Sequence, residues 1–150
     1  MFQDNIFMTE ALKLAKIAAK VSEIPVGAVI VQNNTIIATG YNQRENKHNA
    51  LSHAEIEAIN NACKALNKWR LNDCDIYVTL EPCPMCAGAI LNARINKLIY
   101  AVSDYKSGAC GSVINLFDMP FNHRPKIVAN VLEKECAEEL TNFFQNIRQK

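Results

Sequence analysis

Two periodicities of apolar and polar residues run along this chain, and they predict where its helices and strands lie. Between residues 8 and 22, apolar positions recur at helical spacing while lysines occupy another face, which indicates an amphipathic helix. The runs at 26–31 and 35–41 are rich in β-branched residues, and a polar turn at 32–34 separates them. Because β-branched residues favour strands and asparagine favours turns, these two runs predict a β-hairpin.

The middle of the chain alternates between helical and strand patterns. A second helix is expected to begin near His53, where apolar residues again recur at helical spacing. Short apolar runs predict strands at 75–80 and 97–102, and the segment 85–93 between them has helical character. A strand, a helix and a second strand in succession form a βαβ unit, which favours parallel pairing through a right-handed crossover.

The last third of the chain begins with its longest irregular stretch, residues 103–125, in which 112–117 can form a short helix. Loops of this length are often functional. A final strand is expected at 126–132 and a closing amphipathic helix at 133–148. The elements together predict an α/β fold, a three-layer α-β-α sandwich with a mixed five-stranded sheet, in a single domain over residues 1–150.

Composition limits the class of protein. The 150 residues include 49% hydrophobic and 21% charged residues, which is typical of a soluble globular chain. The formal net charge of +1 gives no bulk electrostatic reason to bind nucleic acid. Residues 1–20 carry Asp4 and Glu10 among the apolar positions, so they resemble neither a secretory signal nor a membrane span. We therefore expect a cytoplasmic protein without membrane association, in which the cysteines are mostly reduced.

The sequence EPCPMC at 81–86 raises the question of what its two cysteines do. A C-x-x-C pair alone fits a redox pair, half of a structural zinc site or part of a catalyst. His53 lies 30 residues before Cys83 and 33 residues before Cys86. One imidazole and two thiolates provide three zinc ligands, the number used by catalytic sites that keep a fourth position for water.

The predicted helices can bring these ligands together. His53 and Cys83 each lie where a helix begins, and the partial positive charge of a helix N-terminus lowers thiol pKa values. Pro84 suits the first turn of a helix, where its missing N–H would have no intrahelical acceptor. Glu55, two residues after His53, is close enough to carry protons for an activated water. The pattern H-x-E…P-C-x-x-C is that of the zinc nucleobase deaminases, and each fixed position matches.

On these motifs the chain resembles the bacterial tRNA-specific adenosine deaminases of the cytidine deaminase-like superfamily. The resemblance implies one zinc deaminase domain of the CMP/dCMP type, and conversion of adenosine to inosine at the wobble position, 34, of a tRNA anticodon. It extends over nearly the whole chain, through IPVGAVIV (24–31), GYN (40–42), HAEI (53–56), YVTLEPCPMCAGAI (77–90), ARI (93–95), DYKSGACGS (104–112) and NHR (122–124).

The resemblance also implies roles for individual residues. By position, His53, Cys83 and Cys86 would bind one Zn²⁺ per subunit. Glu55 would carry protons from water to the ring and to the departing ammonia. Asn42 matches the family asparagine that hydrogen-bonds the target base.

Further positions match the walls of the family's substrate site. The backbone N–H of Ala54 would bond to the base edge, and Val26 and Leu80 would form apolar walls. Asp104 and Lys106 would meet the nucleotides that flank the flipped base, with Asp104 accepting a ribose 2′-OH. That contact would favour RNA over DNA. The expected partners are a tRNA anticodon stem-loop and, from the family, a second copy of the chain in a homodimer.

Two alternatives stay open at this point. A deaminase of a free base or nucleoside, of the guanine or cytosine type, would use the same fold, although His53 disfavours the free cytidine deaminases because these usually have cysteine there. A non-catalytic zinc or redox protein is the more distant alternative. A redox role for the cysteine pair would leave His53 and Glu55 without an explanation.

Overall fold

A five-stranded mixed sheet forms the centre of the protein in the computed structural model, which describes residues 2–148. The strands follow the order β2-β1-β3-β4-β5. β1 pairs antiparallel with both β2 and β3, whereas β3, β4 and β5 are parallel. The predicted mixed sheet, hairpin and βαβ unit are therefore confirmed. The strands are β1 Gly27–Gln32, β2 Thr35–Tyr41, β3 Asp75–Leu80, β4 Lys97–Val102 and β5 Lys126–Val128.

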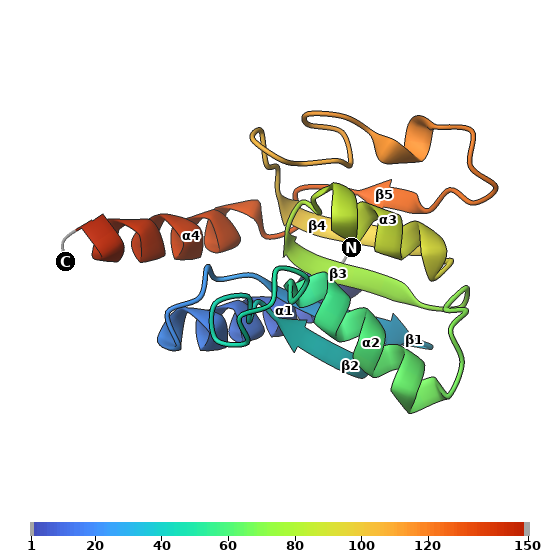
Figure 1. Cartoon of the computed structure of the whole chain (residues 1–150), viewed down its shortest axis with the longest axis horizontal. Helices are drawn as coiled ribbons and strands as arrows, with labels where there is room; N and C mark the ends of the chain where they lie inside the picture. The colour runs from blue at the N-terminus through green and yellow to red at the C-terminus, as the bar shows by residue number, and fades with distance from the viewer. Residues whose placement is uncertain (1, 149–150) are drawn as a thin grey trace.

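Helices cover both faces of this sheet (Figure 1). Along β1, the buried side chains of Ala28 and Ile30 join the core beneath α2 and α3, whereas Val29 and Val31 join the core beneath α1. Successive residues of a strand point to opposite faces, so this alternation confirms the three-layer arrangement. The helices within residues 2–148 are α1 Phe2–Lys20, α2 Ala54–Leu66, α3 Pro84–Asn92, α4 Glu133–Arg148 and the short 3₁₀ helix η1 Leu116–Asp118.

α4 differs from the other helices in how little of it is buried. Cys136, in its first turns, is buried against the α1 side of the sheet. Phe144 and Ile147 further along the helix are exposed, and the C-terminal part of α4 extends past the sheet (Figure 1). The apolar face that the sequence predicts for this helix is thus covered near its start and open towards its end.

Two glycines allow the helices to lie close to the hairpin. A Cβ atom on Gly27 would stand 2.1 Å from the carbonyl oxygen of Ala11 in α1. A Cβ atom on Gly40 would stand 2.4 Å from the carbonyl oxygen of Ala54 in α2. The absence of a side chain at Gly40 therefore sets how closely the first turn of α2 approaches β2.

Three predicted elements differ from the structure. The first helix spans Phe2–Lys20 and not 8–22, and Ser22, with a left-handed φ of 65°, lies outside it. The last strand ends at Val128 and not at residue 132, because Asn130 and Leu132 have left-handed backbone angles, φ 67° and 54°, which a strand does not tolerate. The helix predicted at 112–117 is replaced by the 3₁₀ turn of η1, since the Asn115 side chain accepts a hydrogen bond from the Phe117 N–H at 3.1 Å and starts the turn there.

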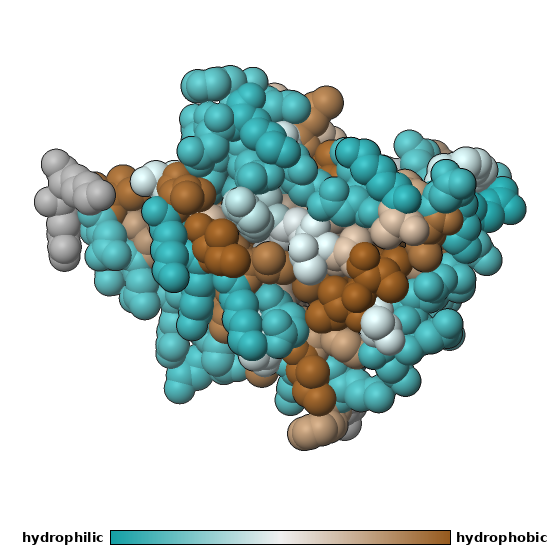
Figure 2. All heavy atoms as spheres, turned by 90° about the horizontal axis from the view of Figure 1, so that it is seen from below, coloured by the Kyte–Doolittle hydropathy of each residue, from teal (hydrophilic) through white to brown (hydrophobic). Residues whose placement is uncertain are grey.

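No disulfide bond links the cysteines of this fold, which all lie in the described part of the chain. All six cysteines are free thiols. Across residues 2–148, no helix combines the length and the apolar character needed to cross a membrane. On the face viewed in Figure 2, hydrophilic side chains occupy the margin and hydrophobic atoms gather across the middle.

Candidate active site

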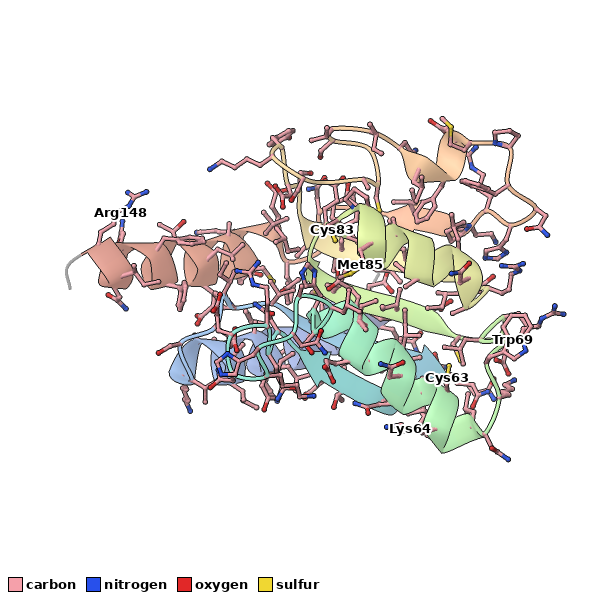
Figure 3. The ribbon with its side chains drawn as sticks, in the orientation of Figure 1. Cys63, Lys64, Trp69, Cys83, Met85 and Arg148 are labelled. Carbon is pink, nitrogen blue, oxygen red and sulfur yellow. The ribbon has the colours of Figure 1, made fainter. Side chains whose placement is uncertain are left out.

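Two helix N-termini converge at one end of the sheet and present the predicted metal ligands. His53 is the N-cap residue of α2 and Cys83 is the N-cap residue of α3, and both have extended backbone angles. Pro84 occupies the first turn of α3, where proline removes no intrahelical hydrogen bond. Figure 3 shows Cys83 at the beginning of α3, directly after β3 ends. Local sequence thus fixes the helix starts, and the packing of α2 beside α3 brings them together.

The three predicted ligands have the spacing of a metal centre. The Nδ1 atom of His53 lies 3.7 Å from the Cys83 Sγ atom and 3.6 Å from the Cys86 Sγ atom. The three ligand atoms all lie within 4.8 Å of one another. Nitrogen and sulfur ligands bound tetrahedrally to zinc, at about 2.05 and 2.3 Å, stand roughly 3.6 Å apart. The donor set therefore fits a zinc ion in both chemistry and spacing.

The pKa values of Cys83 and Cys86 are shifted in a way that suits cation binding. The Cys86 thiol donates a hydrogen bond to Cys83 and lowers the pKa of Cys83 to about 4, with a further contribution from His53. The same bond, together with burial, raises the pKa of Cys86. The two shifts have opposite directions because the bond favours a thiolate at Cys83 and a thiol at Cys86. A divalent cation in place of the Cys86 thiol proton would satisfy both sulfurs as thiolates, the form that binds metal.

Glu55 lies beside this centre as a buried carboxyl group. Its side chain is only 4% exposed. Burial, followed by the negative charge of Cys83, raises the pKa of Glu55 to about 7, against the opposing effect of His53. A carboxyl group with a pKa near neutrality exchanges protons readily in both directions, as general acid–base chemistry requires.

A cavity of about 180 Å³ opens onto the centre. It is smaller than the pockets of about 300–1,000 Å³ that hold drug-sized ligands, so it suits a single base. Cys86 is buried behind it beside the other ligands, and Lys106 is exposed outside it. The cavity is lined by the predicted Val26, Asn42, His53, Ala54, Glu55, Leu80, Cys83 and Asp104, together with Ile24, Arg44, Glu81 and Ser107, which the sequence did not predict.

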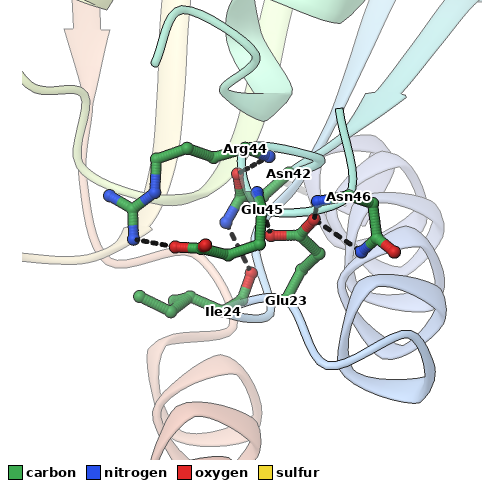
Figure 4. A network of polar contacts seen from close by, with 6 residues as sticks. All are labelled: Glu23, Ile24, Asn42, Arg44, Glu45 and Asn46. Carbon is green, nitrogen blue, oxygen red and sulfur yellow. Dashed lines mark hydrogen bonds and ion pairs between the residues drawn. The ribbon is translucent and has the colours of Figure 1, made fainter. Parts of the chain in front are cut away.

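Asn42 is held in a fixed orientation at the pocket wall. Its Nδ2 atom donates to the Ile24 carbonyl at 3.2 Å, and its Oδ1 atom accepts from the Arg44 N–H at 3.2 Å (Figure 4). An amide has two N–H donors and two acceptor lone pairs. Asn42 therefore keeps a donor and an acceptor for a bound base while its side chain is already oriented.

The loop after Asn42 is anchored by a buried carboxylate, Glu23. Its oxygens accept from the Glu45 N–H at 3.1 Å and from both the backbone and side-chain nitrogens of Asn46 at 2.7 Å (Figure 4). Glu23 is fully buried. In the sequence, Glu23 lies just after the first helix, where an exposed glutamate would fit equally well. The sequence pattern alone therefore does not distinguish a buried Glu23 from an exposed one.

Asp104 also has its carboxylate engaged within its own loop. Oδ1 accepts from the N–H groups of Lys106 and Ser107 at 3.0 and 3.2 Å, and Oδ2 accepts from the Ser107 hydroxyl at 2.9 Å. These bonds fix the direction in which Asp104 faces the pocket. Oδ2, with one partner, retains a free lone pair.

Most of the remaining cysteines and histidines lie away from this centre, except that the Cys110 thiol donates to the Pro82 carbonyl at 3.9 Å, next to Cys83. Cys63 is at the far end of α2, near Trp69 (Figure 3), and its thiol donates to the Trp69 carbonyl at 3.8 Å. His123 fastens the loop before β5 through a 2.7 Å contact between Nε2 and the Ile95 carbonyl. Of the cysteine, histidine and acidic side chains in residues 2–148, only His53, Cys83 and Cys86 form a cluster with metal-ligand spacing.

Similarity to known proteins agrees with this geometry. Residues 2–148 match the family of MafB19-like deaminases. The chain is 46% identical to the tRNA-specific adenosine deaminase of Bacillus subtilis, over 100% of this chain and 94% of that protein. It is 49% identical to the tRNA-specific adenosine deaminase of Rickettsia bellii, over 94% of this chain and 99% of that protein.

A solved structure shows the same fold. It comes from a study of A-to-I editing by tRNA:A34 deaminases at the wobble position of transfer RNA. The two structures superpose with a TM-score of 0.87 at 43% sequence identity, covering 89% of this chain and 98% of that one. The chain therefore belongs to the MafB19-like deaminases and, in the cytidine deaminase-like superfamily, to the tRNA-specific adenosine deaminases.

Proposed function

We propose that this chain catalyses the hydrolytic deamination of adenosine to inosine at position 34 of a tRNA anticodon. One observation carries the chemistry: three metal-ligand atoms within 4.8 Å of one another stand beside a buried carboxyl group in a cavity the size of a base. The relatives named above support the substrate, since each is described as acting on tRNA adenosine.

His53, Cys83 and Cys86 would hold one zinc ion. Bound zinc supplies a Lewis acid that makes water nucleophilic at neutral pH. Glu55 takes a proton from the attacking water as the new bond to C6 of adenine forms. Glu55 gives this proton to the ring nitrogen N1. It then takes the remaining proton from the new C6 hydroxyl group and gives it to the amino group, and the bond between C6 and the amino nitrogen breaks to release ammonia. The balance is one water consumed, with inosine and ammonia as products.

The pocket residues orient the base for this attack. The Ala54 N–H belongs to the first turn of α2, where backbone donors have no intrahelical acceptor, so it can donate to the base edge. The remaining hydrogen-bonding groups of Asn42, which also lines the pocket, bind the base as well. Val26 and Leu80 add apolar surface against the ring faces, which excludes competing water.

An RNA loop suits this pocket because an unpaired nucleotide turns out of its stack at low cost. Asp104 offers its free Oδ2 lone pair to a ribose 2′-OH of a neighbouring nucleotide. Lys106, exposed two residues later, would meet the backbone phosphates. Together the two residues favour a ribonucleotide strand on either side of the flipped base.

A homodimer is part of this proposal. Exposed apolar side chains in the 103–125 segment support it, because a protein contact surface can bury such side chains. Sedimentation equilibrium at micromolar concentration would give twice the mass of the 16.8 kDa chain. A purely monomeric mass would contradict the dimer. The apolar side chains concerned are Val113, Ile114, Met119 and Phe121.

The proposed reaction is tested with an anticodon stem-loop that carries adenosine at position 34, alongside free adenosine, guanine and cytosine. We expect inosine and ammonia from the stem-loop alone. The control is a stem-loop in which the only adenosine is paired within the stem, which should not react. Turnover of free guanine or cytosine without turnover of the stem-loop would replace the tRNA assignment with the free-base alternative.

A further inference from the structure

Glu81 is a buried charged residue at the junction between β3 and the cysteine motif. It is 2% exposed and lies two residues before the metal ligand Cys83. Burial of a carboxylate is costly unless several donors satisfy it. The partners of Glu81 therefore indicate what its charge is used for.

All the hydrogen-bond donors to the Glu81 carboxylate come from one segment, residues 104–112, which we call the 104–112 loop. Oε1 accepts from the Asp104 N–H at 3.0 Å and from the Ser112 hydroxyl. Oε2 accepts from the Cys110 N–H at 3.0 Å and from the Ser112 N–H at 3.1 Å. The loop thus surrounds a single carboxylate, which comes from the segment between β3 and α3.

The fit between the loop and the carboxylate leaves no spare room. A Cβ atom on Gly108 would stand 2.5 Å from both Cδ and Oε2 of Glu81. The neighbouring residue adds a second attachment, because the Ala109 N–H donates to the Pro82 carbonyl at 2.9 Å. The loop is therefore attached at two points to the chain segment that presents Cys83.

The attachment of the 104–112 loop to Glu81 affects the shape of the pocket. Asp104 and Ser107 of the loop line the cavity together with Cys83 and with Glu81 itself. The distance between the substrate-facing loop and the metal ligands is consequently set by the Glu81 carboxylate. Both of its oxygens are already occupied by donors from the protein, so Glu81 is not suited to carry protons during the reaction.

We propose that Glu81 is a positioning residue that holds the 104–112 loop in register with the catalytic centre, so that binding of the RNA around the flipped base depends on it. This inference rests on the proposed function. Glu81 acts through Asp104 and Ser107, and its loss weakens substrate binding more than it slows the chemical step.

The test is steady-state kinetics of Glu81→Gln with the adenosine-34 stem-loop. The amide places an NH₂ group against backbone donors, so at least one N–H of the loop loses its acceptor. We expect KM for the stem-loop to rise about tenfold or more, while kcat changes less than about threefold and the zinc content is unchanged. Ser112→Ala, which removes one donor and keeps the charge, should raise KM about threefold.

Tyr77→Phe is the matched control. It removes a partly buried hydrogen bond, from the Tyr77 hydroxyl to Asp4 at 2.6 Å, on the α1 face of the sheet. We expect a lower melting temperature with KM unchanged. The control separates a general loss of stability from a specific loss of loop position.

The outcomes separate the two proposals. Absence of stem-loop turnover by the wild type overturns the proposed function and with it the role of Glu81. Turnover by the wild type combined with an unchanged KM in Glu81→Gln overturns the positioning role alone, as does a loss of kcat or of zinc at constant KM. If Glu81→Gln does not fold, Ser112→Ala decides between the same outcomes.

Discussion

At the scale of single residues, the partners of a buried carboxylate decide what it does. Glu23 and Glu81 accept hydrogen bonds from backbone N–H groups and serve as anchors for loops. Glu55 is equally buried, but its pKa is raised to about 7 by burial and by the charge of Cys83. Of these three carboxyl groups, Glu55 is the one suited to exchange a proton during a reaction.

Replacement of Glu55 by glutamine should leave the metal and abolish the reaction. The amide side chain would keep the size of the carboxyl group and lose the ability to carry protons, so kcat is expected to fall by about 10²–10⁴-fold. Metal analysis of the same sample should give one zinc per chain, since His53, Cys83 and Cys86 remain. The measurement is stem-loop turnover with elemental analysis.

Glu57→Gln provides the comparison. Glu57 lies on the same helix two residues later and pairs with Lys47 at 3.1 Å outside the pocket. Its loss should leave turnover within about twofold, because exposed ion pairs contribute little. Equal activity of Glu55→Gln and Glu57→Gln would contradict the proton-carrier role.

At the scale of elements, the close packing of α2 on the hairpin positions its N-cap residue, the proposed metal ligand His53. A side chain at Gly40 would collide with the backbone of Ala54 and Ala58. His53 and Glu55 flank Ala54, so a shift of this turn displaces both of them. The geometry of the site therefore depends on Gly40, which has no reactive side chain.

Gly40→Ala should lower both stability and activity, whereas Gly27→Ala should lower stability alone. Each added methyl group overpacks a helix–strand contact and is expected to cost about 1–3 kcal/mol. Gly27 faces α1, whose residues do not line the pocket. Thermal melts and kcat/KM of the folded fraction provide the measurement. Wild-type kcat/KM in Gly40→Ala would show that the site tolerates movement of α2.

At the scale of the whole molecule, the sheet brings distant segments to one edge. The βαβ unit places α3 at the carboxyl end of β3, and ligands in open α/β sheets bind outside the carboxyl ends of strands. The loops that complete the pocket follow β2 and β4. Glu23 joins one of these loops to the end of α1, so part of the stability of the fold depends on a single carboxylate.

Stability should decline in acid through Glu23. Burial raises the pKa of Glu23, but hydrogen bonds from Asn46 and Glu45, together with the charge of Arg44, outweigh burial and leave the pKa below its ordinary value. The stabilising contribution is thus complete above the unfolded pKa of about 4.3 and is lost as pH falls through the lower folded value.

The measurement is urea unfolding of the wild type and of Glu23→Gln between pH 7 and pH 3. The wild type is expected to be the more stable protein at pH 7, and the difference in unfolding free energy should shrink as the pH falls below about 4.3. A difference that stays constant over this range would contradict the lowered pKa.

The sequence by itself determined most of the elements and the candidate ligand set. Strands 75–80 and 97–102 and the closing helix 133–148 lie where the apolar periodicity predicts them, because periodicity reports which face of an element is buried. His53, Cys83 and Cys86 are recognisable by residue type and spacing, and the helix starts are marked by local signals such as Pro84.

Only the tertiary structure decided how the loops around the pocket are held in place. Glu81 binds groups 23 to 31 residues away along the chain, and Glu23 binds groups 22 and 23 residues away. The residue type of a glutamate does not reveal whether water or backbone N–H groups surround its carboxylate. Which of the two surrounds it depends on loop packing, and no local periodicity encodes that packing.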